Sequence, residues 1–164
     1  MKKLMLIAAF CLTGALAANA IEPGTKAIDF KLPTIEGKEF TLSEQTGRVI
    51  VLDFWASWCA PCREEFPFLI ELANQNMDKS FAVVAVNIDK KSANAKAFIA
   101  KLKVEVPFVI PVDAESKIPS KYEVENMPTT FIIDKKGVVR YIHKGFAESY
   151  KEEYKKQIAE LLAE

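Results

Sequence analysis

Two cysteines separated by two residues are the part of this chain best suited to chemistry. Cys59 and Cys62 enclose Ala60-Pro61 and follow directly on an apolar run, Val49 to Trp55. Thiols at this spacing can close into a disulfide and reopen. The pattern therefore predicts thiol-disulfide exchange.

The expected surroundings of the pair give the two sulfurs different roles. A chain that leaves a buried strand and enters a helix at Cys59 puts this residue at the helix N-terminus, where unpaired N–H groups and the macrodipole favour negative charge. Because the thiolate is the attacking species and such positions lower a cysteine pKa to about 3.5 to 7.5, Cys59 is the expected nucleophile. Cys62, one turn later, is expected to lie deeper and to resolve the mixed disulfide.

A zinc site and an inert bridge are the other interpretations of such a pair. Zinc needs four ligands, and residues 21–164 contain no second cysteine pair and a single histidine, His143. A bridge across so small a loop removes little unfolded-state entropy. Redox exchange is therefore the preferred interpretation, and His143 is expected to fill surface or core.

The N-terminus has the pattern of a secretory signal. Lys2 and Lys3 precede an apolar stretch from Leu4 to Ala18, which ends in the small-x-small sequence Ala18-Asn19-Ala20. We expect residues 1–20 to be a signal peptide and residues 21–164 to be one domain, located in the periplasm or another extracytoplasmic compartment. An uncleaved membrane anchor is the alternative, although the run is shorter than the roughly 20 residues that span a bilayer.

Charge and cysteine usage limit the classes of partner. The chain has 22 basic and 22 acidic residues, so neither a nucleic-acid nor a membrane-surface partner is indicated. The third cysteine, Cys11, lies inside the expected signal, so the exported domain holds only the Cys59/Cys62 pair. In an oxidising compartment this pair needs a source of electrons to act as a reductant.

The hydrophobic pattern predicts an α/β domain. An apolar strand, a helix and a second apolar strand in succession favour parallel pairing. The last helix is expected to direct Tyr150, Tyr154, Ile158 and Leu161 inward. The predicted extended segments are 29–32, 38–42, 48–55, 81–88, 107–112, 129–134 and 138–143, and the predicted helices are 59–77, 92–103, 116–122 and 147–163.

Several segments together resemble the thioredoxin superfamily, and more narrowly its exported TlpA/ResA-type thiol-disulfide oxidoreductases. The resemblance covers essentially all of residues 21–164. It implies a thioredoxin-like fold, with a central mixed sheet, helices on both faces, an N-terminal β-hairpin and an insertion before a cis-proline turn. The segments that carry it are Val51 to Cys62, Glu65-Phe66-Pro67, Met127-Pro128-Thr129 and Ile133-Asp134 leading to Gly137.

The resemblance also implies a substrate groove. It places Pro128, with a cis peptide bond, across from the cysteine pair, and makes Met127 and Thr129 the borders of the groove that receives extended peptide. Trp55 and Trp58 are expected to pack around the site, and Trp58, next to Cys59, also offers substrate a flat contact.

Two carboxylates are expected near the thiols. Asp53 stands where thioredoxins keep a buried aspartate that accepts the proton of the deeper thiol, and burial in an apolar strand should raise its pKa. Ala85 occupies the place of a neighbouring lysine in thioredoxins, so a merely structural aspartate is the alternative. Glu65 stands where ResA-like proteins have a functional glutamate, at the border of the apolar helix face. A solvated helix carboxylate is the alternative there.

The function implied by the resemblance is the reduction of protein disulfides by a monomeric extracytoplasmic enzyme. It needs no cofactor or metal, a membrane thiol electron donor restores its dithiol, and cytochrome c apoproteins are a family-level substrate. A disulfide oxidase or isomerase is one alternative, and a copper-handling protein with Cys59 and Cys62 as Cu(I) ligands is another. The Pro-x-x-x-Thr-x-x-Cys pattern of peroxiredoxins is not found.

Overall fold

A four-stranded mixed sheet forms the centre of the computed structural model, which describes residues 21–164 and leaves the expected signal peptide, residues 1–20, outside its description. Strand β3 pairs in parallel with β4 and antiparallel with β5, and β5 pairs antiparallel with β6. All residues of β3 are buried, because neighbours cover both its edges and both its faces. The mixed sheet expected from the resemblance is confirmed. The strands are β3 (Val49–Trp55), β4 (Phe81–Asn87), β5 (Thr129–Ile133) and β6 (Val139–Lys144), in the order β4-β3-β5-β6.

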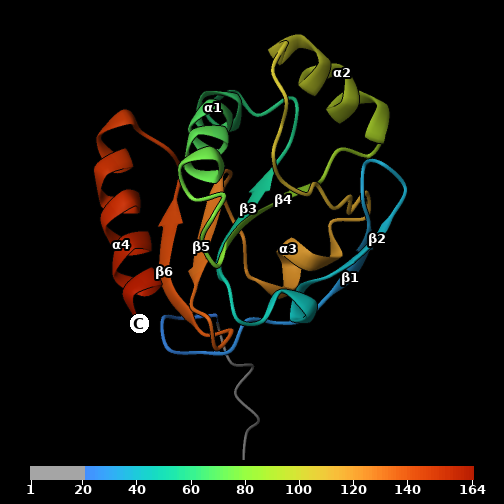
Figure 1. Cartoon of the computed structure of the whole chain (residues 1–164). Helices are drawn as coiled ribbons and strands as arrows, with labels where there is room; N and C mark the ends of the chain where they lie inside the picture. The colour runs from blue at the N-terminus through green and yellow to red at the C-terminus, as the bar shows by residue number, and fades with distance from the viewer. Residues whose placement is uncertain (1–20) are drawn as a thin grey trace, which may run out of the picture.

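Different elements cover the two faces of the sheet (Figure 1). Helices α1 (Ala60–Gln75) and α4 (Lys151–Ala163) pack against one face through a cluster that includes Val51 and Ile132. The hairpin of β1 (Lys31–Pro33) and β2 (Glu39–Thr41) and the short helix α3 (Lys117–Lys121) cover the other face, around Leu52 and Phe54. Helix α2 (Ser92–Leu102) lies on the side of α1 away from α4. Helices α2 and α3 occupy the expected insertion before Pro128.

Interlocking aromatic rings support the start of α1. Phe66 packs against Trp55, Phe98 and Phe108 with ring centroids 4.7, 5.3 and 5.4 Å away, respectively. The cluster to which these rings belong also contains Cys59 and Cys62. The motif therefore rests on a rigid apolar base contributed by the sheet, α1, α2 and the segment before α3.

Two predicted elements differ from the observed ones. Residues 107–112 form isolated pairs instead of a regular strand, because Pro111 has no N–H to continue a ladder. They still lie between the two sheets, with Val109 and Val112 paired to β4 and Pro111 paired to Thr34. The last helix begins at Lys151 after a short 3-10 turn, Glu148–Tyr150, and the expectation that Tyr150 points inward is wrong because it is exposed.

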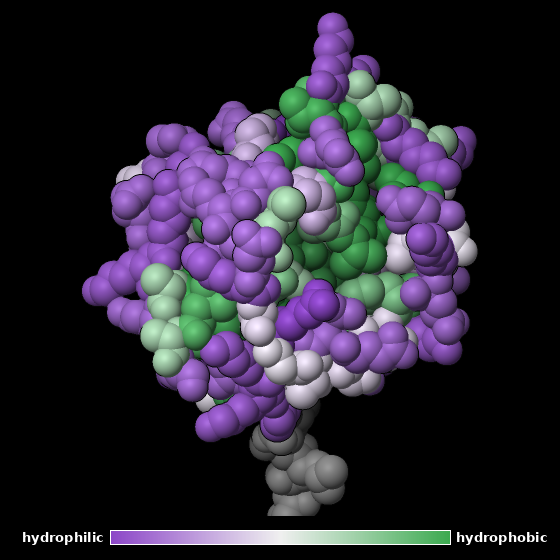
Figure 2. All heavy atoms as spheres, viewed as in Figure 1, coloured by the Kyte–Doolittle hydropathy of each residue, from purple (hydrophilic) through white to green (hydrophobic). Residues whose placement is uncertain are grey.

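An apolar groove runs along the surface between α1 and α2. Figure 2 shows apolar side chains gathered there. Ile70, Met77, Leu102 and Val104 line the groove, whose volume is about 670 Å³. Contiguous apolar surface of this kind is typical of contact sites. No helix within residues 21–164 has the length and apolar character that a membrane span requires.

Candidate active site

Cys59 and Cys62 form a disulfide at the start of α1. Cys59 is the N-cap residue, with extended backbone, and its Sγ accepts a hydrogen bond of 3.3 Å from the N–H of Cys62. The sulfur thus occupies the place that a serine or aspartate oxygen takes in an ordinary helix cap. Pro61 lies in the first turn, where its missing N–H removes no helical hydrogen bond. The position expected for Cys59 is confirmed.

The geometry separates the two sulfurs by access. Cys59 is 6% exposed and Cys62 is 1% exposed, so an incoming disulfide reaches Cys59 first. Trp58 is 65% exposed beside it and is free to contact a substrate. A helix N-terminus is a position that favours a thiolate over a thiol.

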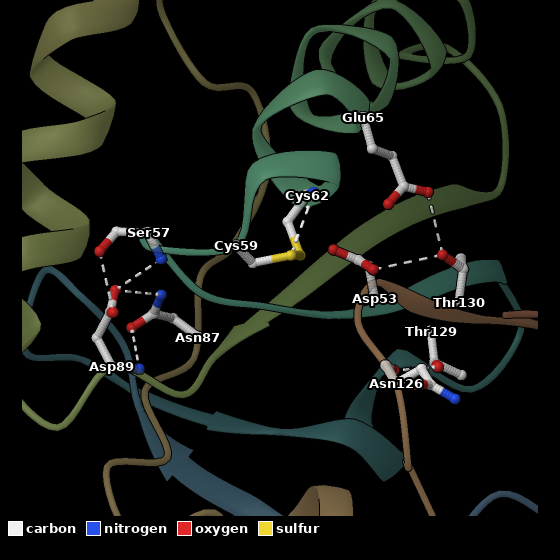
Figure 3. The surroundings of a disulfide bond; sticks show 10 residues. All are labelled: Asp53, Ser57, Cys59, Cys62, Glu65, Asn87, Asp89, Asn126, Thr129 and Thr130. Atoms are coloured by element: carbon white, nitrogen blue, oxygen red, sulfur yellow. Dashed lines mark hydrogen bonds between the residues drawn. A yellow bond between two sulfur atoms is a disulfide. The ribbon is translucent and has the colours of Figure 1, made fainter. Parts of the chain in front are cut away.

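Asp53 lies in a row of residues that crosses the sheet beneath α1 and α4. Its direct partners are Ala85 on β4 and Thr130 on β5, and Thr130 in turn is opposite His143 on β6. The Asp53 side chain is 1% exposed, and its Oδ1 is 3.3 Å from the hydroxyl of Thr130. Figure 3 shows its other carboxyl oxygen on the side that faces the cysteines.

Glu65 is completely buried, deeper than the border position expected for it. Its Oε1 lies 3.2 Å from the hydroxyls of both Thr130 and Tyr154, whereas its Oε2 has no hydrogen-bond partner within residues 21–164. The solvated carboxylate, the alternative for this residue, is excluded. Asp53, Glu65 and Thr130 therefore form one buried polar group beside the cysteines (Figure 3).

Burial sets the ionisation of both carboxyls. Desolvation raises the pKa of Asp53 to about 7, although the hydrogen bond from Thr130 partly opposes the rise. Desolvation and then the charge of Asp53 raise the pKa of Glu65 well above its usual range. The β4 residue opposite Asp53 is Ala85, which carries no charge to lower this pKa, so Asp53 is able to exchange a proton near neutral pH.

The Met127-Pro128 peptide bond is cis, as the resemblance implies. Met127 is half-buried and packs against the cluster that contains the cysteines. Within residues 21–164, neither its N–H nor its carbonyl makes a backbone hydrogen bond. Thr129 differs: it is buried, and its hydroxyl donates to the carbonyl of Asn126, so its side chain does not line an open groove.

Sequence reasoning missed a second polar cluster at the active-site turn. Asp89 Oδ2 accepts hydrogen bonds from the N–H of Ser57 and from Asn87 Nδ2, and Asp89 Oδ1 accepts from the hydroxyl of Ser57. Asp89 and Asn87 are buried, and Figure 3 shows this cluster on the opposite side of Cys59 from Asp53. A sequence signal for this cluster was present: Asn87 ends a strand parallel to β3, Asp89 follows it, and the carboxyl ends of parallel strands meet at one edge of a sheet.

His143, expected to fill surface or core, has defined partners. Its ring stacks on Tyr154 with centroids 4.1 Å apart, and its Nε2 is 2.7 Å from Gln157 Oε1. It thus holds the tyrosine whose hydroxyl reaches Glu65. No group of three or more potential metal-ligating His, Cys, Asp or Glu side chains occurs within residues 21–164.

The sequence of this chain is similar to those of known thiol-disulfide oxidoreductases. Residues 23–142 match the AhpC/TSA family. The thiol-disulfide oxidoreductase ResA of Geobacillus thermodenitrificans is 35% identical over 127 residues, which cover 77% of this chain and 72% of that protein.

Two solved structures share the fold. A Chlorobium tepidum protein assigned as a thiol:disulfide interchange protein DsbE is 42% identical, with a TM-score of 0.82 and coverage of 87% of this chain and 99% of that one. The exposed lipoprotein thioredoxin Etrx1 of Streptococcus pneumoniae is 30% identical, with a TM-score of 0.67 and coverage of 82% and 100%. The chain therefore belongs to the AhpC/TSA family and has the thioredoxin-like fold of its ResA-type and DsbE-type relatives.

Proposed function

We propose that this protein is an extracytoplasmic thiol-disulfide oxidoreductase that reduces disulfides in other proteins. The observation that carries the proposal is the Cys59–Cys62 disulfide at the start of α1, next to a buried carboxyl with a raised pKa. The names of the ResA and DsbE relatives support the same chemistry.

The reaction moves two electrons from the dithiol to the target. The Cys59 thiolate attacks one sulfur of the target disulfide, that bond breaks, and the departing target sulfur takes up a proton. Asp53 removes the proton of Cys62, whose thiolate then attacks Cys59 Sγ. The second target sulfur is released, also as a thiol once protonated, and the Cys59–Cys62 disulfide closes. A membrane thiol donor then restores the dithiol.

The surface around the disulfide suits a polypeptide substrate. Trp58 presents an exposed ring beside Cys59, and the main chain of Met127 is open to pair with an extended segment. We assign Trp58, Met127 and Pro128 to substrate docking. Thr129 supports this turn through its hydrogen bond to Asn126. Cytochrome c apoproteins are a substrate class to test.

Export is proposed on two grounds. Residues 1–20 have the charge, apolar run and small-x-small end of a signal peptide. The pneumococcal relative is named an exposed lipoprotein. Fractionation of cells that express the full chain tests this proposal. We expect the protein to be detected outside the cytoplasm.

Single-cysteine variants test the order of the two attacks. We expect Cys59→Ser to abolish insulin reduction and Cys62→Ser to accumulate a mixed disulfide between Cys59 and its target. Greater reactivity of Cys62 than of Cys59 towards an alkylating agent in the reduced protein would contradict the assignment.

Equilibration with glutathione tests the direction of exchange. A reductant is expected to have a potential below about −230 mV, towards the thioredoxin value. A potential near about −120 mV, typical of a strong oxidant, would instead assign disulfide donation to this protein.

A further inference from the structure

Thr130 connects two buried carboxyls through a single hydroxyl. Its Oγ1 is 3.3 Å from Asp53 Oδ1 and 3.2 Å from Glu65 Oε1. A threonine hydroxyl has one hydrogen to donate and two lone pairs that accept. It therefore donates to only one of the two carboxyls, and the other contact is a hydrogen bond only when that carboxyl is protonated and donates to Thr130. Both contacts are satisfied together when the pair of carboxyls holds one proton.

The groups that neighbouring elements place around the pair are a methyl group, a histidine ring, a phenol hydroxyl and a sulfur. Neither Asp53 nor Glu65 takes part in an ion pair within residues 21–164. On the sheet, Ala85 of β4 is opposite Asp53 and His143 of β6 is opposite Thr130. The Nε2 atom of His143 contacts Gln157 Oε1. Helix α4 contributes the Tyr154 hydroxyl and α1 contributes Cys62. Two ionised carboxylates in such a site would repel each other without compensation.

We propose that Thr130 is a positioning residue that makes Asp53 and Glu65 share one proton and passes it from Asp53 to Glu65. Asp53 gives its proton to Oγ1 of Thr130, and the hydrogen already on Oγ1 moves to Glu65. One O–H bond breaks and one forms at Thr130, and the net charge of the group does not change. Asp53 is left as the carboxylate that the proposed function requires for deprotonation of Cys62, on which this inference rests.

The relay explains the burial of Glu65 and the role of Tyr154. Glu65 keeps the shared proton inside the protein while Asp53 works as a base. The Tyr154 hydroxyl remains a fixed donor to Glu65 Oε1. Loss of the Thr130 hydroxyl removes the path between the carboxyls and leaves Asp53 protonated for a larger fraction of the time at mildly acidic pH.

Single-turnover kinetics separate the two attacks. Excess reduced protein is mixed with a fluorogenic disulfide peptide, and the attack of Cys59 and the release of the target by Cys62 are followed as successive phases. For Thr130→Val we expect release to be about tenfold slower near pH 6, with its pH profile displaced upward by about one unit. The attack phase should be unchanged. Thr130→Ser, which keeps the hydroxyl, should restore release to within about twofold.

Two matched variants distinguish the relay from a loss of packing. Thr34→Val makes the same change at another buried threonine and should leave both phases unchanged. In a Glu65→Gln background, which has no carboxylate to receive the proton, Thr130→Val should slow release by less than a further factor of about two.

The relay is wrong if Thr130→Val keeps the unmodified pH profile, if Thr130→Ser is as slow as Thr130→Val, or if the effects of Thr130→Val and Glu65→Gln multiply. Failure of the unmodified protein to reduce the peptide would contradict the proposed function instead.

Discussion

Replacement of Asp53 by asparagine should change how the stability of the oxidised protein depends on pH. Asp53 is completely buried, and its pKa rises from an ordinary value of 3.8 to about 7 in the folded protein. A group whose folded-state pKa is raised stabilises the fold fully below its unfolded pKa and loses that contribution as the pH rises through the folded pKa. The unmodified protein should therefore be less stable at neutral pH than at mildly acidic pH.

The size of the effect follows from the shift. A rise of about three pKa units corresponds to about 4 kcal/mol of unfolding free energy in total. About 2 kcal/mol of this is lost between pH 5 and pH 7, because the unfolded chain is already largely ionised there while the folded chain ionises only near the upper limit. The asparagine amide cannot ionise, so the Asp53→Asn variant should keep only the pH dependence of the other groups, among them Glu65, whose pKa is also raised by burial.

Urea unfolding of the oxidised protein at both pH values measures this difference. The free energy of unfolding of Asp53→Asn should fall about 2 kcal/mol less than that of the unmodified protein over this range. Glu64→Gln, at an exposed position on α1, is the matched control and should not alter the slope. An identical pH dependence in Asp53→Asn and the unmodified protein would refute the argument that burial governs this carboxyl.

Three further substitutions test other parts of the structure. Asp89→Ala leaves the hydroxyl and N–H of Ser57 without their acceptor. It should lower the free energy of unfolding in a urea titration by about 1 to 3 kcal/mol and should slow thiol-disulfide exchange. Phe66→Ala opens a cavity in the aromatic cluster and should cost about 3 to 5 kcal/mol in the same titration. Trp58→Ala removes an exposed ring and should raise KM for a protein disulfide while the melting temperature stays constant, so a large drop in melting temperature would contradict a docking role.

The sequence alone sufficed for the parts of the fold that depend on local patterns. The apolar run before Cys59 predicted a buried strand, and the turn from that strand into a helix predicted Cys59 at the helix N-terminus. Both are observed. The cis bond before Pro128 came from the resemblance, because a single sequence contains no local signal for this isomer.

The polar group beside the cysteines depends on pairings between distant residues, which explains why it was only partly predicted. Thr130 is 77 residues from Asp53 along the chain and 65 from Glu65. The register of β5 against β3 decides that Thr130, and not Thr129, shares a face with Asp53. A shift of one residue would exchange the two threonines between faces, and local hydrophobicity does not distinguish them.

Residues 107–112 join the two sheets into one continuous hydrogen-bonded surface. On one side the carbonyls of Val109 and Pro111 accept from β4, and on the other the carbonyl of Ile110 accepts from Ile35. The N-terminal hairpin thus shields an edge that would otherwise present unpaired main-chain groups to other molecules. Removal of the hairpin would therefore expose this edge and promote aggregation through edge-to-edge pairing, even though every residue of the redox motif would remain.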